Sequence, residues 1–191
     1  MKNKILQNIK ELQHALTVAG LNHEIWWIYK EKQSRKRFLD VLNTYPLFFQ
    51  TSLHAHFVAM IISLYRLFET RRDTVNMPQL IKLFKKEGTF PQDELTRLDS
   101  EIEQIKPIWV KVSVLRNKLF GHRSNALGID DIWEEANITP NQFKKLIADS
   151  KRILNDMTSI WDRSSHAFNL SATEDTLELL EDLKRLKESR L

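Results

Sequence analysis

The sequence predicts an all-α protein, a bundle of about seven helices. Three observations favour this class. Only 4 glycines and 5 prolines occur among the 191 residues, which leaves little material for tight turns. Long stretches are rich in leucine, isoleucine, lysine, glutamate and glutamine, which favour helix. The apolar residues also recur at spacings of three and four, as on the buried face of a helix.

The N-terminal part is expected to form two helical regions. Ile5, Ile9, Leu12 and Leu16 recur at helical spacing, and Gly20 stands where a C-terminal cap would. These residues predict a first helix over 3–19. A second helical region should follow from 21 to about 42, with a basic run between Lys30 and Arg37. We expect this run to be a solvated face, and a contact with RNA backbone is the alternative.

Capping residues and prolines mark the start of the next two helices. Thr44 and Pro46 supply a cap and a first-turn proline for a third helix that should reach about residue 71. Asn76 and Pro78 repeat this signal for a short helix ended by Gly88.

The remaining helices follow the same rules. Pro91 should open a long helix towards Phe120, which Pro107 is expected to kink or split. Residues 123–138 read as a loop. Thr139 and Pro140 start another helix, and residues 169–191 form a last one, acidic first and then basic.

We expect one domain over 1–191, in which the N-terminal helices 1–43 and the C-terminal helices 139–191 pack on a core formed by 44–122. The run from Phe57 to Phe68 is shorter than a bilayer-spanning helix and contains Arg66, so a buried helix is expected and no membrane contact. The N-terminus lacks the unbroken apolar core of a signal peptide, and the chain has no cysteine. These features predict a cytoplasmic protein.

Few residues form patterns typical of enzymes. His54 and His56 would point about 200° apart on a helix, so they are not expected to bind one metal ion. No glycine-rich phosphate loop, nucleophile elbow or paired-carboxylate motif occurs. The five tryptophans are expected in core packing, with Trp133 in the loop. The net charge of +4 permits an anionic partner without requiring one.

The stretch "VLRNKLFGHRSN", residues 114–125, carries the most unusual combination of side chains. It places Arg116 and Asn117 six and five residues before His122, with Gly121 directly in front of the histidine. On a straight α-helix, Arg116 and His122 would diverge by about 120°, so one helix could not bring them together. Either Gly121 ends the helix and lets His122 turn back, or two copies of the segment meet in a dimer. The alternative is a helix C-terminus capped by Gly121, with His122 and Arg123 at the negative end of the dipole.

The motif "RNKLFGH", in an all-α chain, resembles the HEPN superfamily (higher eukaryote and prokaryote nucleotide-binding domains). The upstream stretches "YPLFF", "IISLYRLFET" and "MPQLIKLFKKEG" are similar to the AbiU-type branch of this superfamily, which is linked to phage abortive infection. The similarity covers residues 40–125.

This resemblance implies a metal-independent endoribonuclease that acts as a homodimer, needs no cofactor and cleaves RNA as a toxin or phage-defence effector. It assigns Arg116 to the scissile phosphate, His122 to acid or base catalysis and Asn117 to orienting one of them. Lys118 and Arg123 would bind RNA backbone. Glu69 matches the acidic end of the upstream stretch and would hold Arg116, although a helical Arg66–Glu69 pair explains it equally well.

Two other functions stay open. HEPN-like domains without nuclease activity serve as dimerisation or nucleotide-binding modules, and a helical adaptor could use Arg116 and His122 as cap residues only. An antitoxin protein is a further expected partner.

Overall fold

The computed structural model describes residues 1–69, 71, 73–121 and 129–190 of the chain. Within these residues it contains nine α-helices, one π-helix and no β-strand. The elements are α1 (Lys2–Lys30), α2 (Lys32–Arg37), α3 (Leu39–Thr44), α4 (Pro46–Arg66), α5 (Met77–Glu87), α6 (Gln92–Leu115), the π-helix η1 (Arg116–Gly121), α7 (Ile129–Ala136), α8 (Pro140–Asp162) and α9 (Thr173–Glu188). The predicted all-α class is confirmed.

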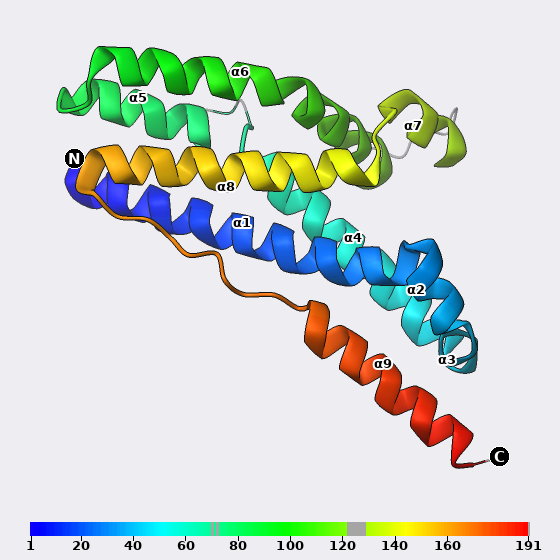
Figure 1. Cartoon of the computed structure of the whole chain (residues 1–191). Coiled ribbons are helices and arrows are strands. Elements are labelled where there is room, and N and C mark those ends of the chain that lie inside the picture. Colours follow the sequence, from blue (N-terminus) through cyan, green and yellow to red (C-terminus); the bar gives the residue numbers. More distant parts are fainter. Residues whose placement is uncertain (70, 72, 122–128, 191) are drawn as a thin grey trace.

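Four long helices form the body of the bundle. Figure 1 shows α8 and α4 running antiparallel to α1, with α6 lying along α8 on the far side from α1. α5 packs beside α6, and α7 follows the far end of α6. The chain from 163 to 172 is extended and leads to α9, which packs on α1 and α3.

The apolar side chains form two clusters. The larger one lies between α1, α4, α5, α6, α7 and α8 and includes the fully buried Met60, Phe84 and Phe143. The smaller one joins the end of α1 to α3, the start of α4 and α9, and includes Phe38 and Leu180. α9 is therefore held to the bundle by a separate and smaller apolar contact.

Two helices start, and one ends, at the capping residues that the sequence predicts. The Asn76 side chain accepts a hydrogen bond from the backbone N–H of Gln79, and Gly88 ends α5 in the left-handed conformation with φ 76°. Thr139 and Gln142 form a reciprocal capping box at the start of α8. The predicted cap Thr44 is wrong: Tyr45 precedes α4 without a side-chain cap, and the Thr44 hydroxyl donates to the Asp40 carbonyl.

The predicted break at Gly20 is wrong. α1 continues through Gly20 to Lys30, and the next turns form the short helices α2 and α3 in place of one region over 21–42. A glycine that ends a helix needs a left-handed conformation, whereas Gly20 stays helical and faces the Lys151 side chain of α8. Packing between two helices therefore accounts for this glycine.

Three further boundaries differ from prediction. α6 runs unbroken through Pro107, which is exposed, so water can hydrogen-bond the carbonyl that the proline leaves without a partner. The predicted loop 123–138 contains α7, and Trp133 on this helix packs 5.2 Å from Phe57 between ring centroids. The third predicted helix ends at Arg66 and does not reach residue 71.

Within the described residues, α4 is the helix that is long and apolar enough to cross a membrane, judged by length and composition. Its 21 residues correct the expectation that this apolar stretch is too short. In the fold, α4 packs along α1 and α6 and buries one face, including Phe57, Ile61 and Leu64.

Candidate functional site

The segment that begins at Arg116 leaves the α-helical path. α6 ends at Leu115, and the chain continues directly into the π-helix over Arg116–Gly121. A π-helix closes its hydrogen bonds from i to i+5, is rare and often occurs at functional sites. The change in backbone geometry therefore coincides with the first residue of the predicted catalytic motif.

Arg116 places its guanidinium over an aromatic ring. Its guanidinium carbon is 4.7 Å from the centroid of the Tyr65 ring, a distance at which the ring face attracts a cation. One terminal nitrogen of the guanidinium donates a hydrogen bond of 3.0 Å to the side-chain oxygen of Asn117. Within the described part of the chain, Arg116 has no carboxylate partner. Most of its N–H donors therefore stay available for an anion.

Tyr65 is held in place by Trp109 of α6. Its ring stacks on the buried Trp109 with centroids 5.9 Å apart and planes 25° apart. The indole N–H of Trp109 donates a 3.0 Å hydrogen bond to the backbone carbonyl of Tyr65. Tyr65 thus contacts both Arg116 and Trp109 and links α4 to η1 and α6. Tyr65 could not be found from the sequence, because no spacing rule connects residues on different helices.

Lys118 has a partner on the neighbouring helix. Its ammonium forms an ion pair with Glu135 of α7. Lys118 would have to leave Glu135 in order to bind RNA backbone as predicted. The following residues, Leu119 and Phe120, pack against the large apolar cluster and anchor the π-helix to the bundle.

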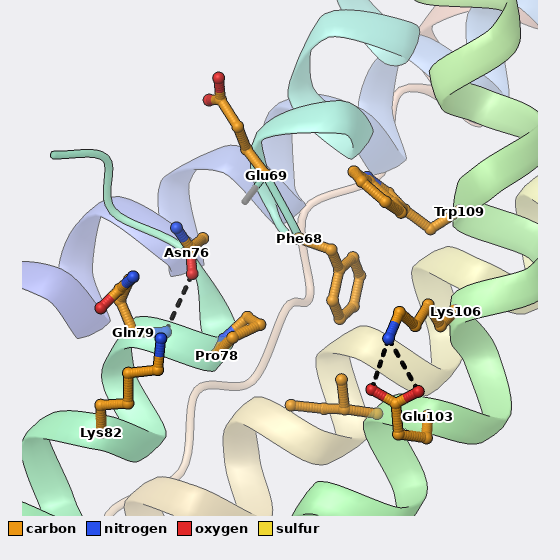
Figure 2. A pocket seen from close by; sticks show the side chains of 10 residues that line it. Phe68, Glu69, Asn76, Pro78, Gln79, Lys82, Glu103, Lys106 and Trp109 are labelled. Carbon is orange, nitrogen blue, oxygen red and sulfur yellow. Dashed lines mark hydrogen bonds and ion pairs between the residues drawn. The ribbon is translucent and has the colours of Figure 1, made fainter. Parts of the chain in front are cut away.

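Glu69 follows the end of α4 and lines a cavity of about 250 Å³ together with Phe68 and Trp109. Figure 2 shows its carboxylate directed away from both rings. In the described part of the chain, neither the predicted contact with Arg116 nor the alternative ion pair with Arg66 is present. Its carboxylate attracts the Arg71 guanidinium electrostatically.

His122 and Arg123 belong to the segment 122–128, outside the described residues. The predicted approach of His122 to Arg116 and the predicted face shared by Arg116 and Arg123 therefore stay predictions.

The two histidines of α4 have separate surroundings, as their spacing predicts. The His54 ring lies 6.1 Å from the Phe120 ring between centroids. His56 shares a 2.8 Å hydrogen bond with the side-chain oxygen of Asn22, and burial lowers the pKa of His56. Among the described residues, no group of three or more histidine, aspartate or glutamate side chains could hold a metal ion.

Comparison with protein-family models matches the AbiU2 model of HEPN domains over residues 2–181. No curated protein and no solved structure matches the chain. The match extends well beyond residues 40–125, which carry the resemblance in the sequence, and it includes all of α1 and most of α9.

Proposed function

Because the chain belongs to the AbiU2 family of HEPN domains, which is related to abortive infection, we propose that it is a metal-independent endoribonuclease. In this proposal it acts in the cytoplasm as a toxin or phage-defence effector, with RNA as substrate and an antitoxin protein as neutralising partner. The observation that carries the proposal is Arg116, which lies on the Tyr65 ring at the start of η1 without a carboxylate partner in the described residues.

The proposed reaction needs only the substrate and this chain's side chains. A base removes the proton of the RNA 2′-hydroxyl, and the 2′-oxygen attacks the adjacent phosphorus. The bond from phosphorus to the 5′-oxygen breaks, and an acid protonates that oxygen. The products are a 2′,3′-cyclic phosphate and a 5′-hydroxyl, so no water or metal ion enters the balance.

The side chains of the motif match the demands of this reaction. The planar guanidinium of Arg116 can bind two phosphate oxygens at once and stabilise the charge that develops on them. A histidine titrates near neutral pH, so His122 can accept or donate the proton. Asn117 holds one end of the Arg116 fork. Arg123 is proposed to bind RNA backbone.

A homodimer with a composite site is part of the proposal. The 120° divergence expected for a straight α-helix does not apply, because Arg116–Gly121 is a π-helix. The dimer depends instead on the family resemblance and on exposed apolar side chains near the motif. Val110, on the last turns of α6, is 47% exposed, and Ile62, one turn before Tyr65 on α4, is 36% exposed. Such residues gain free energy when a second copy covers them.

The test uses Arg116→Ala and His122→Ala in an RNA cleavage assay. Each should lower kcat by about 100-fold or more, because each removes a group that acts mainly on the transition state. Melting temperature and dimerisation should stay unchanged. Arg185→Ala and His166→Ala are matched controls, since both residues are exposed and lie on or before α9, and they should cleave at the wild-type rate. Arg116 and His122 variants that stay fully active but melt at lower temperatures would favour the adaptor function, in which both residues only cap a helix.

A further inference from the structure

Gly20 is an unusual residue for the interior of a 29-residue helix. Glycine weakens a helix, and an isolated glycine in a helical pattern usually has a packing or functional reason. Here the reason is Lys151 of α8. A Cβ atom at position 20 would lie 3.1 Å from the Lys151 ammonium, closer than an ordinary contact. The missing side chain therefore gives this ammonium a place against α1.

The ammonium lies in a cavity between α1 and α8, beside the start of α9. The cavity has a volume of about 470 Å³, which lies in the range of small-molecule sites. Besides Gly20 and Lys151, the lining residues that matter here are His23, Trp27 and Lys144. These residues are not part of the Arg116 site or of the two apolar clusters, although α1 and α8 also contribute residues to those clusters.

The cavity has two positive charges without a carboxylate in contact. Lys151 is half-buried, and its ammonium lies over the Phe168 ring, 5.2 Å from the centroid. Neither Lys151 nor Lys144 has a hydrogen bond or an ion pair within the described residues. The nearby Glu24 carboxylate does not neutralise them by contact. It accepts hydrogen bonds from the Ser171 hydroxyl, the Ala172 backbone N–H and the Thr173 hydroxyl, which holds the start of α9.

A buried nitrogen supports the same conclusion independently. His23 is only 9% exposed, and its Nε2 atom has no hydrogen-bond partner in the described part of the chain. Buried polar atoms normally have partners, so the Nε2 atom leaves a hydrogen-bonding position open beside the cavity, although the ring also interacts with the Pro140 backbone. The cavity also lies along the first turn of α8 at Pro140 and Asn141, where the helix dipole is positive.

One wall of the cavity suits a flat apolar group. Trp27 was expected in the core, but its side chain is 36% exposed and lines the cavity. Ile28 and Ile147 add apolar surface beside it. An indole face binds aromatic rings by stacking, whereas ammonium groups bind phosphate oxygens.

We propose that the cavity between α1 and α8 binds a small aromatic phosphomonoester. The phosphate lies between the Lys144 and Lys151 ammonium groups, and the aromatic ring lies against Trp27. This site is separate from the proposed nuclease site, and its occupation does not depend on RNA cleavage.

Isothermal titration calorimetry with phenyl phosphate tests the proposal. Saturable binding is expected, and inorganic phosphate and phenol should each bind more weakly because each supplies half of the contacts. Lys151→Gln should weaken phenyl phosphate binding by at least about tenfold, since it removes a charged hydrogen bond. Trp27→Leu should weaken phenyl phosphate but not inorganic phosphate. Lys145→Gln is the matched control, because Lys145 lies on α8 outside the cavity and pairs with Asp149.

Gly20→Ala provides a second variant that should not fail to fold. Alanine favours helix, so the melting temperature should stay the same or rise, while the new Cβ displaces the Lys151 ammonium and weakens binding. Arg116→Ala should bind phenyl phosphate like the wild type, which separates this site from the proposed nuclease. Absence of saturable binding, equal affinity for phenol, or wild-type affinity in Lys151→Gln would each overturn the proposal.

Discussion

At the scale of single residues, Arg116 owes its position to a ring that belongs to another helix. A cation over an aromatic face is stabilised by about 0.5–2 kcal/mol, depending on how far water is excluded. Tyr65 provides that face, and Trp109 fixes Tyr65 through the stacked ring and the hydrogen bond to its carbonyl. We therefore regard Tyr65 as a positioning residue for Arg116.

Two substitutions of Tyr65 should distinguish the contribution of its ring from that of its hydroxyl. Tyr65→Phe keeps the ring and should retain cleavage, whereas Tyr65→Leu should lower kcat by about tenfold because the guanidinium loses its support. In an Arg116→Ala background, Tyr65→Leu should cause no further loss. The measurement is the cleavage kinetics and the thermal melting of the wild type, Tyr65→Phe, Tyr65→Leu, Arg116→Ala and the double variant. An equal loss in both backgrounds would mean that Tyr65 acts through the fold and not through Arg116.

The sequence predicted the residues of this site better than their contacts. Arg116 and Asn117 are neighbours in the motif, and their hydrogen bond is local. Tyr65 and Glu135 contact the motif from α4 and α7, and such contacts depend on how helices pack. No hydrogen bond or ion pair links Glu69 to Arg116 in the described residues: Glu69 lies beyond the end of α4, whereas Tyr65, which contacts Arg116, is still on the helix.

At the scale of elements, helix starts were predictable because caps act through neighbouring residues. Asn76 and Thr139 bond to backbone N–H groups three residues later, as their sequences indicate. At Gly20, neighbouring residues are not enough to predict the helix end. Its sequence signal resembles a cap, but the packing of α8 on α1 decides its conformation.

The π-helix was outside what helical periodicity can predict. Its sequence, "RNKLFG", has the apolar spacing of an ordinary helix end. The wider turn changes which side chains share a face, so angles based on α-helix do not apply beyond Leu115. The proposed dimer therefore depends on the superfamily resemblance and the exposed apolar surface near the motif, and not on the α-helical angle between Arg116 and His122.

At the scale of the whole molecule, the account predicts a homodimer. Sedimentation velocity at micromolar concentration should give twice the 22.6 kDa mass of one chain. Val110→Asp should shift the protein to monomer and lower cleavage, because it places a charge in the predicted interface. Leu179→Asp is the control, since Leu179 is also an exposed apolar residue but lies on α9, outside the helices that carry the motif. A wild-type monomer, both alone and with RNA, would contradict the composite site.

The all-α class of the whole chain could be predicted from composition and periodicity, but the packing of the helices could not. Periodicity indicates that a helix has a buried face without indicating which neighbour covers it. The structure places α1 between α4 and α8, and it packs α9 into the smaller apolar cluster with the end of α1, α3 and the start of α4.

If Arg116 and His122 serve cleavage by the RNA's own 2′-hydroxyl, the reaction needs the 2′-oxygen at the cut site and no metal ion. An RNA with a single mapped cut site is incubated with the protein in EDTA, beside the same RNA carrying a 2′-deoxy residue at that site. We expect the first RNA to be cut to a 2′,3′-cyclic phosphate and a 5′-hydroxyl, and the second to stay intact. Cleavage that stops on chelation, or that continues on the deoxy substrate, would show that the proposed mechanism is wrong.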